Sequence, residues 1–136
     1  IDGTNHWLTG YCDWNIVLDS IGGPSHVNNF AGAQVMVDYQ NDVIYYTPYY
    51  YVLKQFSRSM RPGDVALQVD YPATMKTGAD CETQDIFLCA VEKTDGSYAI
   101  NILNMGLETT LPIQLGSHYA KVNLPASSVQ TIIVKL

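Results

Sequence analysis

The second half of the chain has the apolar pattern of β-strands. From residue 65 onward, apolar and polar residues alternate or form short runs rich in branched and aromatic side chains, as strands do. The segments with this pattern are VALQV (65–69), DIFLCAVEK (85–93), SYAINILNM (97–105), LETTLPIQL (107–115), HYAKVNL (118–124) and VQTIIVKL (129–136). Short strands at this regular spacing predict an antiparallel β-sandwich.

Turn and breaker residues support these strand boundaries. Thr94-Asp95-Gly96-Ser97 separates two of the segments, and Gly96 supplies the positive φ that a hairpin turn needs. Pro112 has no N–H to donate to a strand ladder, so it predicts an edge strand or a break within 107–115.

The first half of the chain changes its pattern several times. HWLTGYCD (6–13) is short, apolar and aromatic and predicts a buried strand. Residues 15–34 are dense in Gly, Pro, Asn and Ser and predict a long loop, in which Gly22-Gly23-Pro24 redirects the chain. A phosphate-binding loop is a poor alternative, because no Lys-Ser/Thr follows. QVMVD (34–38) and VIYY (43–46) predict two short strands joined by a turn.

The segment after these strands has the period of a helix. Thr47 is a plausible N-cap, and Pro48 suits the first helical position. Pro62-Gly63 stops the helix. The apolar positions recur every three or four residues, and the basic residues lie toward the C-terminal half, where they complement the helix dipole. The apolar set is Tyr49, Val52, Leu53, Phe56 and Met60, and the basic set is Lys54, Arg58 and Arg61. We expect a helix over 48–60.

This order of elements indicates a composite chain. A strand, a loop and a helix make up one unit of a (β/α)8 barrel, but one unit cannot close a barrel. The first half therefore looks like the end of something larger. Ile1-Asp2-Gly3 looks like the middle of a sequence, so we expect a processed or excised piece.

Composition limits the classes of partner. The 136 residues suffice for one domain, and 47% hydrophobic with 15% charged residues favours a folded chain. A net charge of −6 with only 7 Lys and Arg argues against nucleic-acid binding. No apolar run is long enough to be a transmembrane segment. The 10 Tyr and 2 Trp would suit stacking against sugars, or they fill strands and core, which is the commoner case.

The cysteines and histidines carry no metal motif. The spacing of Cys12, Cys81 and Cys89 excludes CxxC. Cys81 and Cys89 could pair across a hairpin in an oxidising compartment, but the odd count favours three reduced, mostly buried thiols. His6 and His118 are far apart in sequence and lack carboxylates at ligand spacing, so no metal or cofactor is predicted.

Residues 10–30 (GYCDWNIVLDSIGGPSHVNNF), 35–38 (VMVD) and 44–64 (IYYTPYYYVLKQFSRSMRPGD) resemble, in this order, the C-terminal part of glycoside hydrolase family 30, the glucosylceramidase-like enzymes. DIFLCAVEKTDGSYAINILN and SSVQTIIVKL are similar to the β-domain of that family. The resemblance covers essentially the whole chain and is most specific over 7–63. Tyr11 departs from it, because close relatives usually have Trp there, and Cys12 stands where Thr or Ile is common.

The resemblance implies a mainly β fold, in which an antiparallel β-sandwich (64–136) follows the last strand-loop-helix unit of a (β/α)8 barrel (1–63). Residues 6–13 would be the eighth strand, 14–47 the loop above it and 48–60 the eighth helix. The implied reaction is retaining hydrolysis of a β-glycoside by two Glu. Those Glu lie on the fourth and seventh strands of the family barrel, before the start of this sequence.

The residues present agree with that expectation. The chain has three Glu, which are Glu82, Glu92 and Glu108, and all lie in the β-rich half. Each is expected to be a solvated surface carboxylate. No catalytic residue is therefore predicted in this chain.

The resemblance also suggests which residues contact a sugar. Asp13 and Trp14 fall at the C-terminal end of the predicted strand, the face where barrel enzymes bind substrate. Trp14 would line the sugar pocket, or it packs as a core Trp. Asp13 would bind a sugar hydroxyl or hold the loop backbone. Asn29 matches a pocket residue of the family, or it caps a turn.

Three functions remain open at this point. The chain is part of a retaining β-glycosidase, or a carbohydrate-binding β-sandwich, or a structural module without catalysis. In the first case the substrate is glucosylceramide-like or a β-glucan or xylan, and the missing N-terminal barrel portion is a partner. The family resemblance implies a secreted or lysosomal protein.

Overall fold

A computed structural model describes residues 1–70 and 85–136, so Cys81 and Glu82 lie outside the described residues. The helices and strands are α1 (Asp2–Asn5), β1 (Val17–Asp19), β2 (Val35–Asp38), β3 (Val43–Tyr46), α2 (Pro48–Ser59), β4 (Val65–Leu67), β5 (Ile86–Glu92), β6 (Tyr98–Asn104), β7 (Thr109–Leu115), β8 (His118–Leu124) and β9 (Ser128–Val134). They form two compact units, one of residues 9–57 and one of residues 1–8 with 58–136.

The larger unit contains an antiparallel sheet of four strands in the order β4-β5-β6-β9. β5 pairs with β6 along its full length, and β6 pairs with β9. Gly96 in the β5–β6 turn has φ 78°, as the hairpin prediction required. All six strands predicted after residue 64 are present, and the prediction of a mainly β, antiparallel fold is confirmed.

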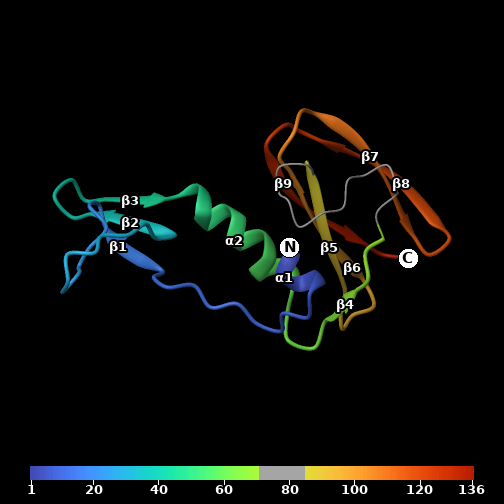
Figure 1. Cartoon of the computed structure of the whole chain (residues 1–136), viewed down its shortest axis with the longest axis horizontal. Helices are drawn as coiled ribbons and strands as arrows, with labels where there is room; N and C mark the ends of the chain where they lie inside the picture. Colours follow the sequence, from blue (N-terminus) through green and yellow to red (C-terminus); the bar gives the residue numbers. More distant parts are fainter. Residues whose placement is uncertain (71–84) are drawn as a thin grey trace. The chain divides into compact units, whose positions relative to one another are not determined.

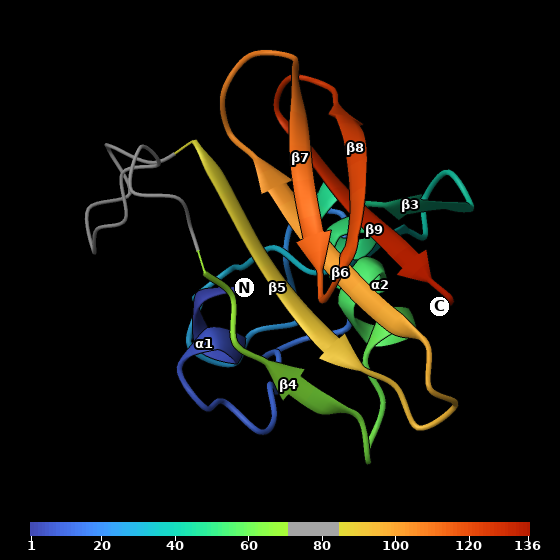
Figure 2. The same ribbon diagram turned by 90° about the vertical axis from the view of Figure 1, so that its right-hand side faces the viewer.

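A two-stranded hairpin of β7 and β8 packs on one face of this sheet, as Figure 2 shows. The buried core consists of Ala90, Ile100 and Ile102 from the sheet with Leu111 and Leu124 from the hairpin. Because side chains alternate along a strand, the apolar positions of 65–134 form a face that only a second layer can cover. Among residues 1–70 and 85–136, β7 pairs only with β8, so Pro112 lies in an edge strand of the described sheet, as predicted.

The opposite face of the sheet carries a buried polar cluster. Asn101 in β6 has no exposed surface and hydrogen-bonds to Ser59 at the end of α2. The hydroxyl of Thr131 in β9 donates to Oδ1 of Asn101 at 2.6 Å. Buried amides are tolerated where their polar atoms have partners. Cys89 lies on the same face, buried and free, and its burial raises the pKa of its thiol. Cys12, by contrast, is exposed.

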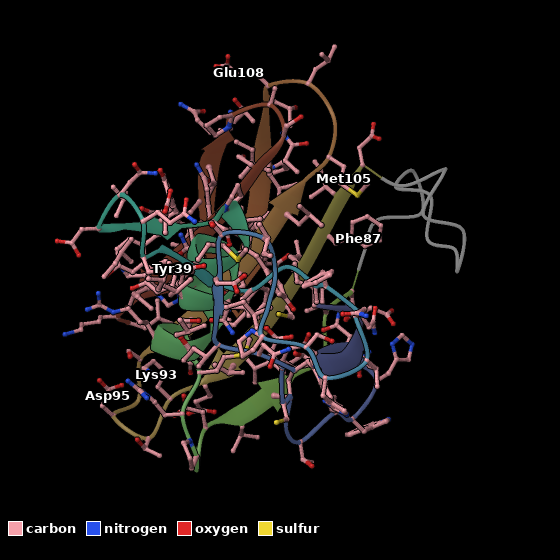
Figure 3. The ribbon with its side chains drawn as sticks, turned by 90° about the vertical axis from the view of Figure 1, so that its left-hand side faces the viewer. Tyr39, Phe87, Lys93, Asp95, Met105 and Glu108 are labelled. Carbon is pink, nitrogen blue, oxygen red and sulfur yellow. The ribbon has the colours of Figure 1, made fainter. Side chains whose placement is uncertain are left out.

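Asp64 and Lys93 form a salt bridge next to this cluster. Lys93 Nζ lies 3.2 Å from Asp64 Oδ2, and the side chain of Asp64 is only 3% exposed. The Asp64 carboxylate also accepts the backbone N–H groups of Arg61 and Thr94, at 2.8 and 3.1 Å. Lys93 Nζ donates as well to the carbonyl of Ser59 at 3.0 Å. Asp64 therefore joins the turn after α2 to the β5–β6 hairpin, where Figure 3 labels Lys93 and Asp95.

The smaller unit contains a three-stranded sheet, in which β2 is central, and most of helix α2 (Figure 1). The predicted strands at 34–38 and 43–46 are confirmed as the antiparallel pair β2–β3. The predicted helix at 48–60 is confirmed as α2. β1 pairs in parallel with β2 and was not predicted, because three residues inside a polar loop are too few to show a strand period. No helix of the described residues is long and apolar enough to cross a membrane.

The predicted strand at 6–13 is wrong. Residues 2–5 form the short helix α1, and 6–13 have no regular structure. Leu8 and Tyr11 are exposed at 52% and 66%. Strands exist through hydrogen bonds to a neighbouring strand, and no segment within 1–70 or 85–136 forms a ladder with 6–13. The segment is apolar, as the sequence shows, but an apolar segment forms a strand only where a second strand pairs with it.

We expect the Asp64→Ala substitution to lower the free energy of unfolding of the sandwich unit by about 3 kcal/mol at pH 7, because it leaves the ammonium of Lys93 without its carboxylate. Urea unfolding followed by circular dichroism measures this loss. Burial would raise the pKa of Asp64, but the hydrogen bonds from Arg61, Thr94 and Lys93 outweigh it and lower the pKa.

This lowered pKa sets the pH dependence of the Asp64 contribution. The contribution is complete above the unfolded pKa of about 3.9 and is lost as the pH falls through the lower folded value. The difference in the free energy of unfolding between wild type and Asp64→Ala should therefore become smaller in acid.

Glu108→Ala is the matched control, because Glu108 is exposed and lies at the other end of the sandwich from Lys93 in Figure 3. It should change stability by less than about 0.5 kcal/mol. Equal losses in the two variants would contradict the role of Asp64.

Candidate functional site

The start of β2 and the start of α2 are tied together by Thr47. Its hydroxyl hydrogen-bonds to the carbonyl oxygens of Ala33 and Gln34, at 3.0 and 3.1 Å. Its backbone N–H donates to the Gln34 carbonyl at 3.0 Å, and its own carbonyl accepts the N–H of Tyr50. Thr47 therefore stands where the N-cap was predicted, but its hydroxyl serves the neighbouring strand. The result is that Gln34 and the first turn of α2 are neighbours.

Asp13 is held between these two elements. Tyr49 Oη in α2 donates to Asp13 Oδ1 at 3.0 Å, and Gln34 Nε2 donates to Asp13 Oδ2 at 3.0 Å. The hydroxyl of Tyr11 lies 2.9 Å from that of Tyr49. A carboxylate with donors on both oxygens has a defined orientation, so this cluster fixes the segment from 11 to 14.

The cluster shifts the pKa values of its members in opposite directions. Partial burial would raise the pKa of Asp13, but the hydrogen bonds from Gln34 and Tyr49 outweigh it and lower the pKa. The contact with the Tyr11 hydroxyl and the hydrogen bond to Asp13 raise the pKa of Tyr49, because a phenolate there would lose the bond to Asp13 and would lie beside a negative charge. Asp13 is therefore ionised and Tyr49 neutral at neutral pH.

Trp14 and Asn29 are placed differently from Asp13. The Trp14 side chain is 90% exposed, directly after the fixed carboxylate. Asn29 is exposed in the long loop, where its backbone N–H donates to Ser25 Oγ at 2.9 Å. Asp13 and Trp14 are adjacent in one segment, whereas no hydrogen bond joins Asn29 to the Asp13 cluster among the described residues. An exposed indole beside a fixed carboxylate can stack on an apolar face and orient a polar group of a ligand.

Three residues of this cluster were missed by sequence reasoning as site residues. Tyr49 was assigned to the apolar face of the helix, Gln34 to the start of a strand, and Tyr11 to the predicted strand. The Tyr49 hydroxyl is a polar end on an apolar body, which a helical period cannot reveal. The one available signal was the position of Tyr49 in the first helical turn, directly after Thr47.

Asp19 organises the turn at Gly22-Gly23-Pro24. Its Oδ1 accepts the backbone N–H groups of Ile21 and Gly23, at 3.1 and 2.7 Å. The backbone N–H of Ala31 donates to the Gly22 carbonyl, which closes the loop on itself. The peptide bond between Gly23 and Pro24 is cis. The prediction that these residues redirect the loop is confirmed.

The two described Glu side chains lie apart from the Asp13 cluster. Glu92 and Glu108 are exposed, as predicted for each. Within the described ranges, no group of three or more His, Cys, Asp or Glu side chains lies close enough to hold a metal ion.

Two family models match successive parts of the chain. The glycosyl hydrolase family 30 TIM-barrel domain matches residues 1–60, and the glycosyl hydrolase family 30 beta sandwich domain matches residues 74–132. The first match contains the whole Asp13 cluster. The second contains most strands of the sandwich.

Curated relatives are glucosylceramidases by name. Putative glucosylceramidase 1 of Caenorhabditis elegans is 29% identical over 99% of this chain and 26% of its own length. Lysosomal acid glucosylceramidase of Mus musculus is 33% identical over 74% of this chain and 18% of its own length. The chain thus spans about a quarter or less of these relatives.

Two solved structures have folds similar to that of this chain. The crystal structure of SrfJ from Salmonella typhimurium matches 91% of this chain and 26% of that chain, with a TM-score of 0.76 and 26% identity. An endo-beta1,6-glucanase matches 87% of this chain and 25% of that chain, with a TM-score of 0.69. At 24% identity, this second likeness concerns the fold alone.

We expect the Gly22→Ala substitution to loosen the loop that carries Asn29. Gly22 has φ +91°, and a Cβ there would clash with the carbonyl oxygen of Ala31. Both the backbone strain and this clash act against the hydrogen bond from Ala31 to Gly22. Amide hydrogen exchange at Ala31 should accelerate by about fivefold or more, which corresponds to about 1 kcal/mol.

Gly32→Ala is the matched control in the same loop. Gly32 has no positive φ, and a Cβ there meets nothing within 4 Å. Exchange at Ala31 should stay within about twofold of wild type in this variant, as expected for an unstrained surface change. Similar acceleration in both variants would show that the loop does not depend on Gly22.

Proposed function

We propose, since the chain belongs to glycosyl hydrolase family 30, that it is the C-terminal part of a retaining β-glycosidase of the glucosylceramidase type. Family membership confirms the resemblance seen in residues 10–64. The observation that carries the proposal is the Asp13 cluster. It lies in the segment matched by the barrel domain, and it holds a carboxylate directly before an exposed Trp14.

In this proposal the chain divides as residues 1–63, the terminal unit of a glycosidase barrel, and residues 64–136, the β-sandwich domain. The successive family matches support this order. The remaining barrel strands and helices belong to the N-terminal barrel portion of the whole enzyme, which is the partner of this chain.

Trp14, Asp13 and Asn29 supply one wall of the sugar pocket. The indole of Trp14 stacks on the apolar face of a sugar ring, and the polar groups fix the orientation of the ring. Asp13 has lone pairs beyond those used by Gln34 and Tyr49, so it can still accept a sugar hydroxyl. The exposure of Trp14 and of Asn29 supports this assignment.

Bond cleavage requires groups outside this wall. Retaining hydrolysis uses two carboxyl groups about 5–5.5 Å apart, one as nucleophile and one as acid and base. We place both Glu in the preceding barrel portion, and the exposed positions of Glu92 and Glu108 on a sandwich support that placement. No cofactor takes part in this reaction.

The names of the relatives narrow the substrate class. Two of them are a lysosomal acid glucosylceramidase and a putative glucosylceramidase. We therefore propose a β-glycoside of the glucosylceramide type as the substrate of the whole enzyme, with β-glucan or xylan as the alternative. This assigns the enzyme to sphingolipid or carbohydrate metabolism, in a lysosomal or secreted location.

The purified 136-residue chain should not hydrolyse an aryl β-glucoside, because the pair of carboxyl groups that cleaves the bond lies elsewhere. Release of the coloured aryl alcohol measures this. If hydrolysis is seen, the triple variant Glu82→Gln, Glu92→Gln, Glu108→Gln tests whether a Glu of this chain is its source. Loss of the activity in the triple variant would overturn the placement of the catalytic groups, whereas unchanged activity would point to a contaminating enzyme.

The fluorescence of Trp14 should change when sugar is added, whereas the fluorescence of Trp7 should not. Both indoles are 90% exposed, so they form a matched pair of fluorescent reporters. In the Trp7→Phe variant, methyl β-glucoside at millimolar concentrations should change the emission of Trp14 in a saturable way. In the Trp14→Phe variant, the emission of Trp7 should stay constant. A flat response from Trp14 would argue against its place in the sugar wall.

A further inference from the structure

We propose that Tyr49, Tyr11 and Gln34 are positioning residues that act through Asp13 on the presentation of Trp14. The use of Trp14 for a sugar rests on the proposed function. The positioning itself rests on the hydrogen bonds around Asp13. None of the three residues was identified as part of a site from the sequence.

The two donors reach Asp13 from different elements. Tyr49 comes from the first turn of α2 and bonds to Oδ1, whereas Gln34 comes from the residue before β2 and bonds to Oδ2. The bonds of the Thr47 hydroxyl to the carbonyls of Ala33 and Gln34 keep the two donors together. When each oxygen of a carboxylate accepts a hydrogen bond from a different element, rotation about χ2 breaks at least one of these bonds.

The direction of the protons follows from the chemistry of the groups. An ionised carboxylate only accepts, so Tyr49 uses its single hydroxyl proton in the bond to Asp13. In the 2.9 Å contact between the two phenols, Tyr11 must then be the donor. The order is therefore Tyr11 to Tyr49 to Asp13, and removal of one hydroxyl weakens the bonds that follow it.

Trp14 directly follows Asp13, the last residue in this series of hydrogen bonds. The segment from 11 to 14 is attached at the Tyr11 hydroxyl and at both oxygens of the Asp13 carboxylate. The Trp14 side chain is 90% exposed. With so little packing around the indole, its direction depends on how the backbone beneath it is held.

Among the described residues, the Asp13 carboxylate is held by neutral groups. Within residues 1–70 and 85–136, no Lys, Arg or His side chain forms an ion pair with Asp13. The titratable groups that face Asp13 are Tyr11 from its own segment and Tyr49 from α2, and Gln34 from the β2 side is neutral. The charge on Asp13 is therefore balanced by neutral donors, and each of them can be removed singly.

The experiment uses the 136-residue chain with Trp7→Phe, in which Trp14 is the only Trp. Tyr49→Phe, Tyr11→Phe and Gln34→Ala are introduced one at a time. NMR titration of the Asp13 carboxyl carbon gives its pKa, and the emission of Trp14 is followed over the same pH range without any sugar. Tyr51→Phe is the control, because Tyr51 lies in α2 and packs on Tyr50 without joining the Asp13 hydrogen bonds.

We expect the emission of Trp14 to change with the same pH midpoint as Asp13. Tyr49→Phe and Gln34→Ala should each raise the pKa of Asp13 toward its ordinary value and move the emission midpoint equally. Tyr11→Phe should do the same to a smaller extent, because it acts through Tyr49. Tyr51→Phe should change neither midpoint. A role limited to folding would not move the two midpoints together.

Two results would overturn the proposal. One is an Asp13 pKa that stays the same in Tyr49→Phe and Gln34→Ala. The other is a Trp14 emission that does not change over the pH range in which Asp13 titrates. Amide exchange in the β2–β3 pairs reports whether a variant remains folded. If Tyr49→Phe unfolds this pairing, Tyr11→Phe and Gln34→Ala decide the outcome. Because no sugar is present, failure here leaves the proposed function standing, and a flat sugar titration leaves the positioning role standing.

Discussion

The buried carboxylate of Asp64 is the constraint on which the larger unit depends. At the end of α2 the chain turns toward β4, and this turn leaves backbone N–H groups without a partner inside a helix or strand. Asp64 accepts the N–H groups of Arg61 and Thr94 and the ammonium of Lys93. The same bonds keep the charge on Asp64, because they outweigh the effect of burial on its pKa.

The same use of a carboxylate recurs through the smaller unit. Asp19 accepts two backbone N–H groups in the long loop, and Asp38 accepts the N–H groups of Gln40 and Asn41 in the β2–β3 turn. Asp13 accepts donors from Gln34 and Tyr49. With 13 acidic and 7 basic residues, the chain has too few cations to pair every carboxylate. Neutral donors take their place, and they are directional, so each carboxylate defines a local backbone geometry.

This arrangement explains how a loop-rich unit can present an aromatic side chain. The three strands of that unit have three or four residues each, and its core is small. Defined geometry at the Asp13 cluster therefore comes from hydrogen bonds rather than from packing. In the sandwich, by contrast, a continuous apolar core holds the strands together, and the polar cluster at Asn101 is buried. In the proposed function, sugar binding belongs to the first unit, whereas the larger continuous core belongs to the second.

The sequence by itself determined the elements whose signals are local. Alternation gave the six strands after residue 64, the helical period gave α2, and Gly96 and Pro112 marked the hairpin and the edge strand. The motif order over 10–64 was sufficient for the family. Tertiary structure alone decided the state of 6–13, the existence of β1 and the contacts of Asp13. A strand needs a partner, and a hydrogen bond between Asp13 and Tyr49 joins residues 36 positions apart. Such pairings leave no period in the sequence, because they depend on where the backbone between them runs.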